Sequence, residues 1–181
     1  MLPITVPARE MWNEEAQMFF TIPETPLQLE HSLLSISKWE AKWKKPFLET
    51  KQLTPAEWRD YVRCMTLSPK NPDPTVYICL TAKNLADVKA YVNDPMTATT
   101  IKEQNNRGGR GQFVTSELIY YWMVAAQIPF ECERWHLNRL MVLIRICGEK
   151  SKPPKKMSKR ENARSRSALN AQRRAAMHSN G

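Results

Sequence analysis

Cysteine and histidine are the side chains of this chain that would ligate a metal or pair as nucleophile and base. The sequence holds three histidines and four cysteines, which are His31, His136 and His178, and Cys64, Cys79, Cys132 and Cys147. Cys132 and His136 stand four residues apart, so a helix would place both on one face, as two zinc ligands or as a thiolate and imidazole pair. Two ligands do not make a site. Unless Cys64 or Cys147 joined them, we expect a packed thiol and a hydrogen-bonded imidazole.

Motifs that carry enzyme chemistry are absent from the sequence. It contains no HExxH, GxSxG or paired-carboxylate motif, and its cysteines show no CxxC spacing. Such cysteines are typical of buried free thiols in a reducing compartment. The glycine-containing segment KEQNNRGGRGQ at residues 102–112 lacks the spacing of a phosphate-binding loop, so we interpret it as a basic loop that orders on assembly. We therefore expect a protein that is not an enzyme and that uses no metal or cofactor.

The most apolar stretch, residues 115–148, predicts a pair of helices joined by a turn. Thr115 is an expected N-cap, and Pro129 should end the first helix at about residue 127 or 128. The second helix should begin near Glu131 and end at Gly148, a residue suited to a helix C-terminus. We expect this helical hairpin to be central to the fold.

The second of these helices is apolar on nearly every side. Between residues 140 and 146 only Arg145 is charged. A helix of this kind is either buried in the core or covered by an oligomer or client protein. It is too short to cross a bilayer, which requires about 18 apolar residues or more.

The first 50 residues predict a small antiparallel β element. Residues 2–7 and 16–22 should form a hairpin around the polar segment 12–15, with a third strand at 26–30. Helices should follow at residues 32–44, 54–67 and 83–92, the second of them opened by a capping box from Thr54 to Glu57. The expected fold class is α+β and mostly α, with the β element packed on the helical domain.

The net charge of +9 lies entirely in the C-terminal segment. Residues 150–181 hold ten of the 27 Lys and Arg residues and one of the 18 acidic residues, which leaves 17 of each for residues 1–149. We therefore divide the chain into a neutral, mainly helical domain, 1–149, and a basic linker and arm, 150–181.

The arm should form a helix from Ser158 to about Met177 that carries few large apolar side chains. Its candidate binding residues are Lys155, Lys156, Lys159, Arg160, Arg164, Arg166, Arg173 and Arg174. Such an arm is either a solvated tail or a contact for RNA, DNA or an acidic protein surface. The absence of aromatic residues beside these charges argues against stacking on bases.

Several segments together resemble one protein family. They are LQLEHSLLSISKWEAKWKKPF at 27–47, PMTAT at 95–99, the run from IYYWMVAAQIPF to PPKKMSKRE at 119–161, and LN-x-x-R at 169–173. This pattern is similar to small proteins of tailed bacteriophages with long non-contractile tails, which are described as tail assembly chaperones. The resemblance extends over nearly the whole chain.

The resemblance implies a non-enzymatic chaperone in the cytoplasm of the infected host cell. Its expected partners are the tape-measure protein, a long apolar helical chain, and the tail-tube protein; a homo-oligomer is a further expectation. The helical hairpin would offer a reversible apolar groove. We expect Trp122, Trp135, Leu140 and Ile144 as anchors, with His136 and Arg139 at the rim.

Two other function classes remain open at this point. A structural protein of the virion neck or tail would use the same helices for permanent subunit contacts. A nucleic-acid-binding protein would depend on the arm, and its affinity would fall steeply with salt. No membrane partner is expected.

Overall fold

The computed structural model describes residues 1–14, 17–99, 113–151 and 159–177, except for the side chains of Lys159 and Glu161. Its contacts divide the chain into two compact units, Met1–Gly148 and Glu149–Gly181. The structure is 56% helical and 16% strand, so the predicted α+β, mostly α class is confirmed. The glycine-containing loop predicted at 102–112 lies outside the described residues.

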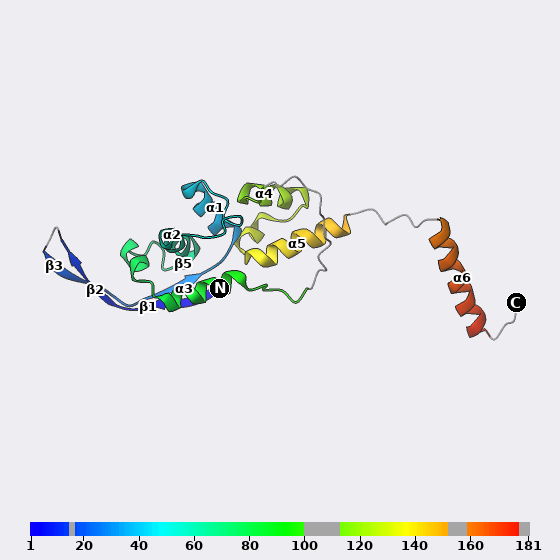
Figure 1. Ribbon diagram of the computed structural model, residues 1–181, viewed down its shortest axis with the longest axis horizontal. Helices are drawn as coiled ribbons and strands as arrows, with labels where there is room; N and C mark the ends of the chain where they lie inside the picture. The colour runs from blue at the N-terminus through cyan, green and yellow to red at the C-terminus, as the bar shows by residue number, and fades with distance from the viewer. Residues whose placement is uncertain (15–16, 100–112, 152–158, 178–181) are drawn as a thin grey trace. The chain divides into compact units, whose positions relative to one another are not determined.

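The first unit begins with strands and continues mainly with helices (Figure 1). The strands are β1 (Leu2–Val6), β2 (Arg9–Asn13), β3 (Met18–Ile22), β4 (Thr25–Leu29) and the short β5 (Thr66–Ser68). The helices are α1 (Leu33–Trp43), α2 (Pro55–Met65), α3 (Ala82–Asn93), α4 (Ser116–Ala125) and α5 (Leu137–Lys150), with 3-10 turns η1 (Pro74–Cys79) and η2 (Phe130–Arg134).

Local sequence signals explain where the first helices begin. Ser32, Thr54 and Thr81 each accept a hydrogen bond from the backbone three residues later, and each of those later side chains bonds back to the cap. This reciprocal arrangement satisfies backbone N–H groups that a helix start leaves without partners. The helices predicted from residues 32, 54 and 83 are therefore present with small shifts at their ends.

The four N-terminal strands form one long antiparallel ribbon. Leu2 lies opposite Leu29 and Asn13 lies opposite Met18, in a register that continues from the β1–β4 pair into the β2–β3 pair. The ladder is interrupted next to Pro7 and Pro23, which have no N–H to donate. The predicted pairing of residues 2–7 with 16–22 was wrong, because the polar segment taken for the turn belongs partly to β2.

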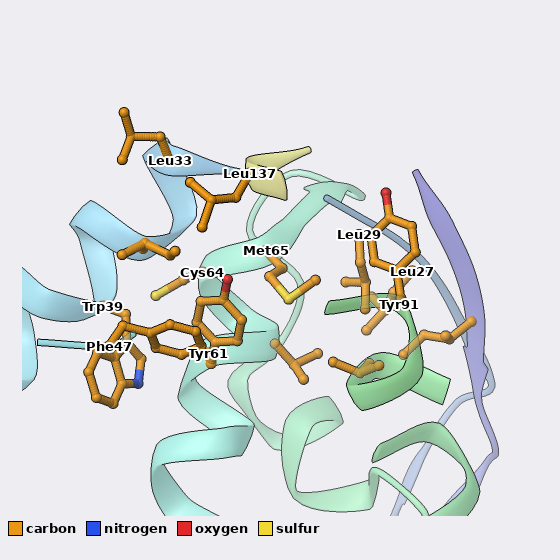
Figure 2. Close-up of a cluster of buried hydrophobic side chains, with 14 of the residues drawn as sticks. Leu27, Leu29, Leu33, Trp39, Phe47, Tyr61, Cys64, Met65, Tyr91 and Leu137 are labelled. Carbon is orange, nitrogen blue, oxygen red and sulfur yellow. The ribbon is translucent and has the colours of Figure 1, made fainter. Parts of the chain in front are cut away.

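The main core lies between strands β1 and β4 and helices α1, α2 and α3 (Figure 2). The rings of Trp39, Phe47 and Tyr61 form its aromatic part, with Phe47 at 5.2 Å from Trp39 and 4.1 Å from Tyr61 between centroids. Leu27 and Leu29 enter it from β4. Polar groups inside are paired: the Trp39 indole donates to the Glu57 carbonyl at 3.1 Å, and Tyr91 donates to the Glu30 carboxylate at 2.7 Å.

The segment predicted as a helical hairpin contains two helices with different limits from those expected. Residues near Glu131 form the 3-10 turn η2, and α5 begins only at Leu137. Before it, Ser32 and His136 form an isolated antiparallel bridge, and the Leu137 amide donates to the His31 carbonyl at 2.8 Å. The predicted end at Gly148 was also wrong, since α5 continues to Lys150.

The second unit contains helix α6 (Lys159–Ala176). Every described side chain of this helix is exposed. Ser158, the predicted first residue of the arm helix, lies outside the described residues.

Candidate partner-binding surface

Helix α4 is held in place at its N-terminus by a buried carboxylate. Glu40, on α1, accepts hydrogen bonds at 2.8 Å from the backbone amides of Phe47 and of Ser116, the first residue of α4. Thr115 caps the same helix by accepting from the Leu118 amide. Since α4 and η2 also pack against α1, α1 determines which face of α4 turns inward.

The inward and outward faces of α4 are both largely apolar. Ile119 and Met123 are buried against the core. On the outward side Tyr121 is 65% exposed and Val124 is 58% exposed. A helix in a soluble domain normally carries polar residues on its solvent side, so this outward face lacks the expected polar cover.

Turn η2 extends this apolar surface. Phe130 is 57% exposed, and its ring lies 6.3 Å from that of Tyr120 between centroids. We call the surface formed by Tyr120, Tyr121, Val124 and Phe130 the α4 face. The Tyr120 hydroxyl donates to Glu133 at 2.8 Å, and burial together with this carboxylate raises the pKa of Tyr120 well above its usual value.

Acidic residues predominate in the segment that carries the α4 face, and Arg134 is an exposed cation at the end of η2. Residues 113–133 include Glu117, Glu131 and Glu133 and no Lys or Arg. Glu117 and Glu131 are exposed, and neither forms a salt bridge with the part of the chain that the structure describes. A partner of this surface would gain most from apolar side chains bordered by cations.

Two of the predicted anchor and rim residues belong to the core instead. Leu140 has 0% exposure, and His136 is buried. His136 Nε2 lies 3.0 Å from the Tyr91 carbonyl, and its Nδ1 accepts from the Asn138 amide at 3.3 Å. A neutral imidazole with its proton on Nε2 satisfies both bonds. Neither side chain is therefore available to a partner of this folded unit.

Trp135 and Arg139 lie together at a second place. Arg139 stacks over the Trp135 ring at 4.5 Å from its centroid, and Trp135 is 37% exposed. Both line a cavity of about 450 Å³ with residues that include Tyr91 and Met96.

The other predicted anchors, Trp122 and Ile144, are half-buried. Among the described residues, no ring contact joins Trp122 to Trp135. The structure thus does not bring the six predicted residues into one groove.

Cys132 and His136 do not share a helix face. Cys132 is the middle residue of η2, and His136 precedes α5. Burial raises the pKa of the Cys132 thiol. Within the described ranges no three His, Cys, Asp or Glu side chains cluster as metal ligands. No helix found there is long and apolar enough to span a membrane.

The basic-arm candidates fall partly on α6. Arg160, Arg164, Arg166, Arg173 and Arg174 are exposed along this helix. Lys159 is its first residue, and Lys155 and Lys156 lie outside the described residues. Residues 159–176 carry six cations and one acidic residue.

Sequence reasoning missed Tyr121, Val124 and Phe130. Their signal was the absence of any charge between residues 118 and 130, which leaves α4 without a charged side chain after Glu117. Comparisons with models of protein families, with curated protein sequences and with solved structures found no match.

Proposed function

We propose that this protein is a phage tail assembly chaperone that binds an apolar helical partner, the tape-measure protein, through its α4 face. The observation that supports the proposal is that α4 is apolar on both its buried and its exposed sides. The sequence resemblance described above suggests the partner. The proposal places the protein in the cytoplasm of the infected cell and requires no enzymatic step.

The mechanism follows from the exposure of the face. A tape-measure chain that is not yet surrounded by tail-tube subunits exposes apolar helix surface and tends to aggregate. Laying such a helix against Tyr121, Val124 and Phe130 would shield that surface by the helix-in-groove mode of recognition. Because a face of this size buries little area, binding would be reversible when tube subunits arrive.

The proposal is tested by the variant Tyr121→Asp/Val124→Asp. Both side chains point outward, so the fold should persist while co-purification with a tape-measure fragment from infected cells is lost. Ile78→Asp is the matched control, since Ile78 is 48% exposed on η1, away from α4 in sequence. Retained binding by the double variant would show that the face is wrong.

Mass spectrometry of purified particles separates the chaperone from a structural protein of the virion. Absence from the particle, combined with tape-measure protein in the pull-down, supports the chaperone. Stoichiometric presence in the particle would instead assign the α4 face to a permanent subunit interface.

A further inference from the structure

The cations of α6 are distributed unevenly around the helix. Successive residues of a helix are rotated by about 100°, which places Arg160, Arg164, Arg166, Arg173 and Arg174 within one half of its circumference. At one border of that half, Arg166, Leu169 and Arg173 follow at spacings of three and four and form one stripe. Leu169 is 47% exposed between the two arginines.

This stripe is complementary to the α4 face. The stripe has an apolar centre with a cation on either side, and the α4 face has an apolar centre bordered by the exposed carboxylates of Glu117 and Glu131. The segment 113–133 contains no cation, and the first one after it is the exposed Arg134 at the end of η2. Arg166 and Arg173 are seven residues apart, about 10 Å along the helix.

We propose that α6 of one copy docks on the α4 face of a second copy, with Leu169 against Tyr121 and Val124. Arg166 and Arg173 then lie near Glu117 and Glu131. Each chain offers one stripe and one face, so two chains can exchange arms and close a symmetric dimer in which both contacts are satisfied. A nucleic acid would use the arginines but would leave Leu169 and the α4 face without apolar partners.

Docking also explains how α6, whose described side chains are mostly polar and all exposed within its own chain, is stabilised as a helix. In proteins most helical stability comes from the packing of one face, so burial of one stripe of this 18-residue helix against a partner stabilises it. The inference rests on the proposed function only for the role of the face: the arm would cover the surface until the client displaces it.

Sedimentation of the full chain measures the dimer directly. Arg166→Glu/Arg173→Glu turns two attractive pairs into repulsive ones and should weaken self-association by about tenfold or more. Arg160→Glu/Arg164→Glu changes the net charge equally but lies away from the stripe, so it should leave the dimer intact. Combining the first variant with Glu117→Arg/Glu131→Arg should restore association, because the charges are exchanged across the contact.

Three outcomes would overturn the inference. They are a monomer at all concentrations, equal weakening by both arginine pairs, and association that disappears after nuclease treatment. The last would assign the arm to nucleic acid. The proposed function fails on a different result. In that case the native chain forms the dimer as described, but the arm variant, whose α4 face is uncovered, binds no tape-measure fragment.

Discussion

The buried imidazole of His31 makes the stability of the first unit depend on pH. His31 is 1% exposed; its Nδ1 bonds to the Tyr61 hydroxyl at 2.5 Å, and its ring lies 5.0 Å from that of His136. Burial, with the neighbouring His136 as a smaller cause, lowers the pKa of His31 from 6.5 to about 3. The folded protein therefore keeps this imidazole neutral at pH values where the unfolded chain protonates it.

The sign and size of the effect follow from proton binding. Below pH 6.5 the unfolded state holds one more proton at His31 than the native state, so the free energy of unfolding falls as the pH falls. The loss is about 1.4 kcal/mol per pH unit until the folded pKa near 3 is reached. Between pH 7 and pH 5 it amounts to about 2 kcal/mol, a measurable part of a typical stability of about 5–15 kcal/mol.

Urea unfolding at pH 7 and pH 5, followed by tryptophan fluorescence, tests this value. His31→Gln removes the titrating ring and leaves the other histidines of the chain in place. Between pH 7 and pH 5 the free energy of unfolding should fall by about 2 kcal/mol more in the native sequence than in the variant. Carboxylates titrate mostly below this range and contribute little. Equal losses in the two proteins would refute a neutral, buried His31.

Three further predictions concern stability and use the midpoint of urea unfolding as the measurement. Leu140→Ala should lower the free energy of unfolding by about 2–5 kcal/mol because it leaves a cavity in the core. Ile78→Ala, at an exposed position, should lower it much less. A similarly small loss for both variants would place Leu140 at the surface. Glu40→Gln should cost about 1–3 kcal/mol, since an amide has one oxygen for two backbone donors, and an unchanged midpoint would mean that these bonds contribute nothing. Thr54→Ala should cost about 1 kcal/mol and Thr54→Ser much less, because serine retains the cap; equal losses would contradict the capping role.

The helices with cap signals were predictable because their determinants are local. Ser32, Thr54 and Thr81 each form reciprocal bonds within three residues, so the sequence contains both partners of each cap. The strand pairing was not predictable in the same way. Register depends on which residues form the turn, and alternation alone does not distinguish a turn at residues 12–15 from one that begins two residues later.

The start of α5 and the composition of the binding surface depended on distant residues. The bridge from Ser32 to His136 delays the helix, and nothing near residue 131 indicates it. The apolar character of α4 was evident in the sequence, but α1 decides which of its faces is buried. Leu140 and His136 were therefore selected wrongly, and Tyr121 and Val124 were overlooked.

The bonds of Glu40 connect segments that are 76 positions apart in the chain, and this affects how the first unit opens. If α1 unfolds, the N-terminus of α4 loses its acceptor and its packing surface at once, so both helices should exchange their amide hydrogens through the same cooperative opening. Closing so long a loop during folding is entropically costly, which makes α4 a late element in the pathway. A ligand that rests only on the outer side of α4 would then slow hydrogen exchange in α1 as well.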